Sequence, residues 1–236
     1  EDIEIFIVES QPPVINKTIV GPSFGQCPPD PESQKPCYLD TASSIKVNVV
    51  DPEPHPSDNV VCRWAYTVNG GEPIIGGQGL GNEFIVKFPE ESEHNLIIEC
   101  KDALGNRVHD EEVFIVDKTA PSITKKFEGP YFAEETQSGL VEWINLQTKI
   151  IPIVNDSPPH PSGVKEISYR TTLVDDDEAC RSTQICQGTK GDESKEFTSL
   201  PLIGGLFPIA QESCHLIEIK AIDNVDKTTL HKQCVF

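Results

Sequence analysis

The eight cysteines are the residues of this sequence whose chemistry is easiest to recognise, as disulfides or as metal ligands. Zinc sites usually contain cysteine pairs two residues apart, but no such pair occurs, and the closest cysteines are Cys180 and Cys186. The C-x-x-C-H motif of covalent haem attachment is also absent. An even number of cysteines without methionine favours disulfides in an oxidising compartment. We therefore predict an extracellular, cell-surface location.

Two glycine-containing segments resemble catalytic or ligand-binding motifs. GPSFG at 21–25 matches the G-x-S-x-G elbow of serine hydrolases, but Ser23 is followed by proline-rich sequence where the elbow requires a helix. Gly77, Gly79 and Gly81 suggest a phosphate-binding loop, but a strand pattern follows them rather than a helix N-terminus. We expect turns at both places. No set of nucleophile, base and orienting residue is visible, which predicts a non-enzymatic protein.

An acidic run offers oxygen ligands. It consists of Asp175, Asp176, Asp177 and Glu178. Several carboxylates can chelate calcium, but the run lacks the spaced oxygens and fixed glycine of a dedicated calcium loop. We expect a solvated turn and no cofactor, with calcium as the alternative.

The overall charge and hydropathy exclude some partners. Lys and Arg total 19 against 38 Asp and Glu, a formal net charge of −19. Such a surface repels phosphate backbones, which argues against nucleic acid. No apolar run approaches the ~18 residues typical of a membrane span. Two sequons, at Asn16 and Asn155, fit a glycosylated surface protein.

Comparison of the chain with itself shows two copies of one domain. Three matches occur in the same order: FIVESQPPVINKTIVGP from Phe6 with FIVDKTAPSITKKFEGP from Phe114, DPEPHPSDN from Asp51 with DSPPHPSGV from Asp156, and HNLIIECKDALGN from His94 with HLIEIKAIDNVDK from His215. They place a boundary near Lys118–Pro121. We assign the domains to residues 9–119 and 120–236.

Each copy has the pattern of β-strands. Leu96, Ile98 and Cys100 alternate with Asn95, Ile97, Glu99 and Lys101, and no segment shows a convincing helical period. Roughly seven short strands per ~110 residues, separated by turn signals, are typical of a β-sandwich. The sequence predicts an all-β fold.

The repeat register predicts one disulfide. Cys62 aligns with Ile167, and Cys100 aligns with Ala221. A cysteine pair and an apolar pair are interchangeable only if the two positions face each other in the core, so we predict Cys62–Cys100. The other pairings rest on proximity: Cys27 with Cys37, Cys180 with Cys186, and therefore Cys214 with Cys234. Four cysteines permit three connectivities, so the pairing in the second copy stays open.

Some acidic residues also recur in the register. Asp102 and Asp223 occupy matching turns, and Glu9 and Asp117 stand at the domain junctions. An ion that joins domains is a hypothesis for these positions.

SGVKEISYR, HLIEIKAIDNVDK, ECKDALGN and the junction VDKTAPSI resemble tandem immunoglobulin-like or fibronectin type III-like modules of bacterial and archaeal surface proteins. The resemblance covers residues 9–236. It implies two disulfide-stabilised immunoglobulin-like β-sandwiches in a surface filament, stalk or S-layer. The alternative is an adhesin or carbohydrate-binding module that uses the insertions 21–40 and 176–206 to bind glycans.

The first eight residues, EDIEIFIV, resemble the last strand of the first copy, HDEEVFIV at 109–116. Both copies already have a final strand, so the opening segment is an extra N-terminal strand. Its apolar residues are Ile3, Ile5, Phe6 and Ile7. An isolated strand exposes apolar surface and unpaired backbone. We expect it to end a preceding repeat, or to pair with a neighbouring subunit by β-strand addition.

Overall fold

The chain divides into two compact units, Glu1–Lys118 and Thr119–Phe236, in a computed structural model. The structure describes residues 4, 8–29, 35–52, 59–175 and 177–236. The division falls within the predicted junction at Lys118–Pro121. Ile3, Ile5, Phe6 and Ile7, the residues of the predicted extra strand, lie outside the described residues.

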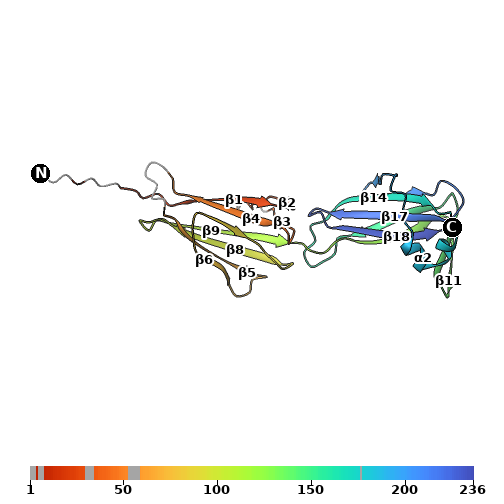
Figure 1. The fold of residues 1–236 in the computed structure, drawn as a ribbon, viewed down its shortest axis with the longest axis horizontal. Helices are drawn as coiled ribbons and strands as arrows, with labels where there is room; N and C mark the ends of the chain where they lie inside the picture. The colour runs from red at the N-terminus through yellow and green to blue at the C-terminus, as the bar shows by residue number, and fades with distance from the viewer. Residues whose placement is uncertain (1–3, 5–7, 30–34, 53–58, 176) are drawn as a thin grey trace. The chain divides into compact units, whose positions relative to one another are not determined.

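The first unit is a sandwich of two sheets (Figure 1). One sheet has the order β1-β4-β7, with β1 at Val14–Val20, β4 at Ser44–Val50 and β7 at Glu83–Val86. The other has the order β2-β3-β9-β8-β5-β6, with β2 at Ser23–Gly25, β3 at Cys37–Leu39, β9 at Arg107–Val116, β8 at Glu93–Lys101, β5 at Val61–Val68 and β6 at Ile74–Leu80. All pairs are antiparallel except β3 with β9.

Period-2 patterning accounts for the core of this unit. In β4 the buried residues are Ile45, Val47 and Val49, and in β8 they include Leu96 and Ile98. Alternate residues of a strand point to opposite faces, so each sheet buries one face against the other. Burial of one such side chain stabilises the fold by about 1.5–3 kcal/mol. The all-β prediction is confirmed.

The Cys62–Cys100 disulfide is confirmed, and the two residues lie directly opposite each other on β5 and β8. Their Cα atoms are 4.1 Å apart, and both side chains belong to the buried core. In the second unit Ile167 lies directly opposite Ala221 in the same way. The exchange of a cysteine pair for an apolar pair therefore reflects one cross-strand position. Cys27 also bonds Cys37, as predicted.

The glycine-rich segment around Gly76 and Gly77 is part of a strand rather than the expected turn, because it forms β6. A Cβ at Gly76 would lie 2.1 Å from Cη2 of Trp64, and one at Gly77 would lie 2.8 Å from its Nε1. The glycines therefore let the strand pass directly over the indole of β5.

The second unit repeats the sandwich with additional elements. Its sheets are β10-β13-β16 (Ser122–Glu128, Lys149–Asn155, Phe207–Pro208), the hairpin β11-β12 (Tyr131–Thr136, Gly139–Ile144), and β15-β14-β17-β18 (Thr198–Leu200, Val164–Leu173, His215–Asp223, Thr228–Val235). Two short helices follow β14: α1 at Glu178–Arg181 and α2 at Thr183–Gly188. The sequence showed no helical period there, because segments of four and six residues are too short to produce one.

The predicted pairing of the four cysteines in the second unit is wrong. The structure joins Cys180 to Cys214 and Cys186 to Cys234. Both helical cysteines are buried in one small core with Cys214, which directly precedes β17, and with Cys234 of β18, so each bonds one of these instead of its neighbour in the sequence. On the strands, Cys234 lies opposite Leu216, not opposite Cys214. The two disulfides tie the helical insertion to β17 and β18.

Neither described helix has the length and hydrophobicity that crossing a bilayer would require.

Candidate metal centre

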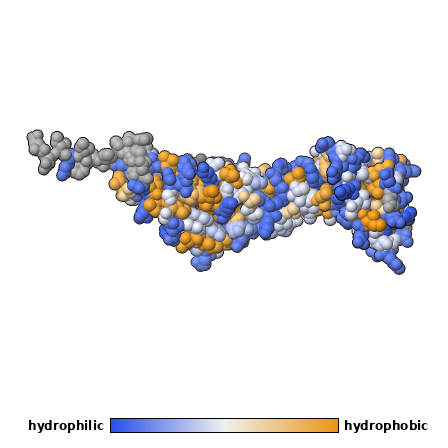
Figure 2. All heavy atoms as spheres, viewed as in Figure 1, coloured by the Kyte–Doolittle hydropathy of each residue, from blue (hydrophilic) through white to orange (hydrophobic). Residues whose placement is uncertain are grey.

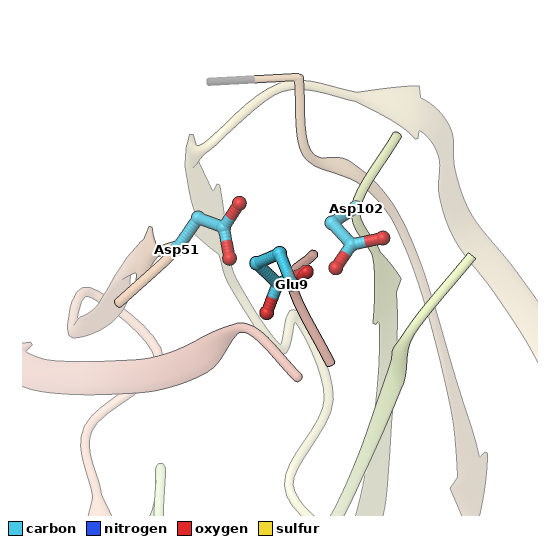
Figure 3. A group of neighbouring side chains, drawn as sticks. All are labelled: Glu9, Asp51 and Asp102. Atoms are coloured by element: carbon cyan, nitrogen blue, oxygen red, sulfur yellow. The ribbon is translucent and has the colours of Figure 1, made fainter. Parts of the chain in front are cut away.

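Three carboxylates converge at one end of the first unit: Glu9, Asp51 and Asp102 (Figure 3). One oxygen from each lies within 4.8 Å of the others. The Asp51 residue is 8% exposed and Asp102 is 4% exposed, while Glu9 is half-buried. In Figure 3 the carboxylates point toward one another.

Strand ends position these side chains. Glu9 precedes β1, Asp51 directly follows β4, and Asp102 directly follows β8. Because β1 and β4 are antiparallel with Val14 opposite Val50, the start of one strand lies beside the end of the other. Asp102 comes from the second sheet. The cluster therefore connects both sheets and the chain that enters the sandwich.

The turn after β8 holds Asp102 in place. Its Oδ1 accepts hydrogen bonds from the backbone N–H groups of Gly105 (2.7 Å) and Asn106 (2.9 Å). The side-chain amide of Asn106 donates to Oδ2 of Asp102 and to Oε2 of Glu9, each at 2.7 Å. One amide thus orients two of the three carboxylates.

The electrostatics keep Asp102 ionised. Burial alone would raise the pKa of its carboxyl, but the hydrogen bonds from Asn106, Gly105 and Leu104 lower this pKa below its usual range. Among the described residues, no lysine or arginine forms an ion pair with Glu9 or Asp102. Negative charges at this separation repel one another, and a cation would offset that repulsion.

The donor set suits a hard divalent cation. Ca²⁺ takes oxygen ligands at about 2.3–2.6 Å, so ligands on opposite sides of the ion lie about 5 Å apart. One oxygen from each of the three carboxylates is therefore close enough to the other two to share one such ion. Three carboxylates, each mono- or bidentate, supply about half or more of the ligands that calcium needs.

The second unit has matching residues at the same places in its own sandwich. Asp156 directly follows β13, and its carboxylate accepts hydrogen bonds from the N–H groups of Gly163 (2.6 Å) and Ser157 (3.1 Å). Asp223 ends β17, is fully buried, and accepts from the N–H groups of Val225 (2.9 Å) and Lys227 (2.8 Å).

The sequence already contained the signal for this set. The three repeat matches align Glu9 with Asp117, Asp51 with Asp156 and Asp102 with Asp223, so each position is acidic in both copies. The sequence-based hypothesis of an ion site includes the junction and turn residues but not Asp51 and Asp156. These two aspartates are the first residues of a proline-rich repeat match, which predicts only a loop.

The acidic run is less organised. Asp176 lies outside the described residues, and Asp175, Asp177 and Glu178 are exposed. Within the described part of the chain, these carboxylates do not form a group of three at ligand spacing. Asp177 instead precedes α1 as its N-cap residue, and Glu178 lies in its first turn.

The sequon asparagines are both exposed on strands, Asn16 in the middle of β1 and Asn155 at the end of β13. Their glycosylation stays a prediction. Ser23, the residue of the hydrolase-like motif, begins the short strand β2.

No family model matches the chain. No curated protein matches it. Among solved structures, it is similar to the fibronectin(III)-like modules of CbhA from Clostridium thermocellum. That similarity has a TM-score of 0.39 and 14% sequence identity, and it covers 91% of this chain and 93% of the other.

Proposed function

We propose that this chain is a non-enzymatic structural segment of an extracellular protein, such as a surface filament, stalk or S-layer of a prokaryotic cell. The observation that carries the proposal is the repetition of a whole sandwich, with two disulfides locking each copy. Disulfides persist in oxidising compartments, and tandem domains are a common way to build length.

A bound calcium ion completes the first sandwich in this proposal. Glu9 lies outside the sheets, whereas Asp51 and Asp102 end strands of different sheets. An ion held by all three would fix the entering chain to the end of the sandwich. The geometry of the carboxylates and the ionised state of Asp102 support this role.

Immunogold electron microscopy on cells of the source organism tests the structural role. Antibodies against the folded chain should label filaments, stalks or a layer outside the cell membrane. Label confined to the cytoplasm would contradict the proposal, and label on a freely secreted protein would favour the binding role below.

A cavity of about 450 Å³ lined by residues of β5, β6, β8 and β9 favours a second candidate function, the binding of acidic glycans. Arg63, Lys101, Arg107 and His109 line it. Lys101 lies directly opposite Arg107 on β8 and β9, and like charges in that arrangement are destabilising unless they are neutralised. Glu99 also lines the cavity and forms an ion pair with Arg63, which leaves Lys101 and Arg107 as the charges that suit a carboxylated or sulfated sugar.

The predicted binding insertions contribute differently. The segment 176–206 contains both helices and exposes Leu202, Ile203 (92% exposed) and Leu206. Apolar side chains interrupt the polar surface elsewhere too (Figure 2).

A glycan array tests binding: wild-type protein should retain uronate- or sulfate-bearing glycans, and Arg107→Glu should release them. Equal retention of neutral glycans would show that the cavity does not select acidic glycans.

A further inference from the structure

An open edge of the six-stranded sheet is formed by β6, because among the described strands it pairs with β5 alone. It is seven residues long and contains neither proline nor a charged residue, and the uncharged stretch of sequence extends over residues 73–82. Ile74 and Ile75 are 44% and 64% exposed. Long, exposed edge strands pair readily with other chains, so proteins usually shorten, charge or cover them. The first two of these protections are absent from β6.

The other described edge strands are protected. Three of them, β2, β15 and β16, are only two or three residues long. Each of the longer ones contains at least one charged residue: Lys17 in β1, Glu83 in β7, Lys125 in β10, Glu134 in β11, Glu142 in β12 and Lys232 in β18. Among the edge strands that the structure describes, β6 is therefore the exception.

The second unit shows how the same edge is closed elsewhere in the chain. There β15 takes the place of β6, since it pairs with β14, whose Ile167 aligns with Cys62 of β5. It has three residues, and Lys195 and Glu196 precede it while Pro201 follows it. Charged residues and proline beside a short edge strand discourage further pairing.

An apolar row on the outer face of the sheet ends at β6. Ile75 lies opposite Ala65 of β5, and Ala65 lies opposite Ile97 of β8. Ile97 alternates with the buried Leu96 and Ile98, so the row faces away from the core. Ala65 and Ile97 are both partly exposed. Apolar surface thus continues from the open edge onto the sheet.

In the second unit the corresponding positions are covered. There Arg170 and Glu218 lie opposite each other at the positions of Ala65 and Ile97 in the repeat. Glu218 is 2% exposed, and a Cβ on Gly191 would lie only 1.8 Å from its Oε2. Nη1 of Arg170 donates to the backbone carbonyl of Asp192 at 3.0 Å. This segment of the insertion therefore covers that face, whereas the apolar row of the first unit is partly exposed.

We propose that β6 pairs with β6 of a second copy of this chain, antiparallel and around a two-fold axis at Ile75. A two-fold contact closes both open edges at once, because each copy supplies the strand that the other lacks. It also brings the two apolar rows together. The net charge of −19 makes copies repel one another, so they approach most closely where the surface is uncharged. Residues 73–82 provide such a surface.

The register at this axis avoids like charges. In an antiparallel pair centred on Ile75, a residue three positions before it lies opposite a residue three positions after it. Glu72, the nearest charged residue along the chain, therefore lies opposite the neutral Gln78 of the other copy. The pairing thus brings no two carboxylates face to face within the strand.

Two bulges in β6 limit the length of this contact. One occurs at Gly76 and the other at Gln78 and Gly79. Ile75 precedes both, so the axis falls on the regular part of the strand. Bulges bend an edge strand and restrict its pairing. We therefore expect a reversible dimer and no open-ended aggregate, since the two-fold contact uses up the edge.

Sedimentation equilibrium of the purified chain, with its disulfides formed, tests the proposal. At increasing protein concentration the mass should rise from 26.0 kDa to twice that value. Salt should strengthen the dimer, because it screens the repulsion between two acidic chains. A mass that stays at 26.0 kDa at every concentration would overturn the proposal, and so would growth beyond a dimer.

Charge variants locate the contact. Ile75→Lys places two ammonium groups at the axis and should raise the dissociation constant of the dimer at least about tenfold. Ile203→Lys, a matched change at a 92% exposed residue of the second unit, should leave that constant unchanged. Circular dichroism establishes that both variants are folded. A folded Ile75→Lys that dimerises like the wild type would place the contact elsewhere and refute the proposal.

Mixed variants test the two-fold axis itself. Ile75→Glu alone should dimerise as poorly as Ile75→Lys. An equimolar mixture of the two should dimerise again, because opposite charges then meet across the axis. No recovery in the mixture would show that Ile75 of one copy does not meet Ile75 of the other, against the proposed axis.

A deletion separates this contact from pairing through the opening segment. Removal of residues 1–8 should leave the dimer intact, because the proposed contact lies in β6. Loss of the dimer on deletion would assign the association to the opening segment instead and would overturn the proposal.

Discussion

Ile167 and Ala221 lie directly opposite each other on β14 and β17, at the position where the first unit has the Cys62–Cys100 disulfide. The same cross-strand position therefore accepts either an apolar pair or a covalent bond. This equivalence predicts the effect of replacing the disulfide with the apolar pair.

The double variant Cys62→Ile/Cys100→Ala should fold, because it installs the pair of the second unit. Loss of the cross-link, which spans 38 residues, should lower the free energy of unfolding of the first unit by about 2–4 kcal/mol. Urea unfolding measures this change. An unfolded double variant, or one of unchanged stability, would contradict the equivalence of the two positions.

Calcium should stabilise the first unit. At a calcium concentration 100 times the dissociation constant, binding adds about 2.7 kcal/mol to the free energy of unfolding. Differential scanning calorimetry should show a higher melting temperature with calcium than with a chelator. Asp51→Asn should remove that difference, whereas Asp226→Asn, an exposed change in the ion pair with Lys165, should not. Identical melting curves with and without calcium would refute the metal centre.

The second unit should lose stability below about pH 6.5. Burial lowers the pKa of His231, and the charge of Lys125 on β10 lowers it further, against the opposing effects of Gln233 and Glu142. Neutral His231 therefore contributes to the free energy of unfolding above the pKa that it has in the unfolded chain. This contribution is lost as the pH falls through its pKa in the folded protein.

His231→Gln isolates this effect, since it removes the titrating group while the other histidines remain. The loss between pH 6.5 and 5.5 should be below about 1 kcal/mol, because solvent screens a half-buried ring. Chemical unfolding at a series of pH values measures it. A wild-type slope equal to that of the variant would show that His231 does not titrate in this range.

Peptide mapping without reduction should recover Cys180 bonded to Cys214 and Cys186 bonded to Cys234. Cys186→Ser should release one thiol, on Cys234, and leave the bond of Cys180 intact. Recovery of a small peptide closed by Cys180 and Cys186 would support our sequence-based pairing instead.

The repeat register predicted the Cys62–Cys100 disulfide and alternation predicted the strands, because aligned positions and alternation follow directly from period-2 packing. Ile45, Val47 and Val49 are one example: every second residue is apolar, and all three are buried. The pairing of Cys180 and Cys186 failed because sequence proximity says nothing about which way two short helices face.

The metal centre was only partly predictable. The matching turns pointed to Asp102 and the domain junction pointed to Glu9, but Asp51 meets them only because β4 ends beside the start of β1. The ion pair of Lys17 on β1 with Asp110 on β9 was not predicted either, since the two residues are 93 positions apart in the sequence. Such groups depend on how two sheets are packed, which no local pattern specifies.

The central claim is that the chain consists of two independently locked sandwiches that bear load as a structural segment, and single-molecule force spectroscopy tests it most directly. Pulled from its ends, the chain should unfold in two separate steps. Each step should release less length than its residue count implies, because Cys62–Cys100 and the bonds spanning Cys180 to Cys234 keep segments closed. A reductant should lengthen both steps. A single step, or a gradual extension without discrete steps, would contradict the account.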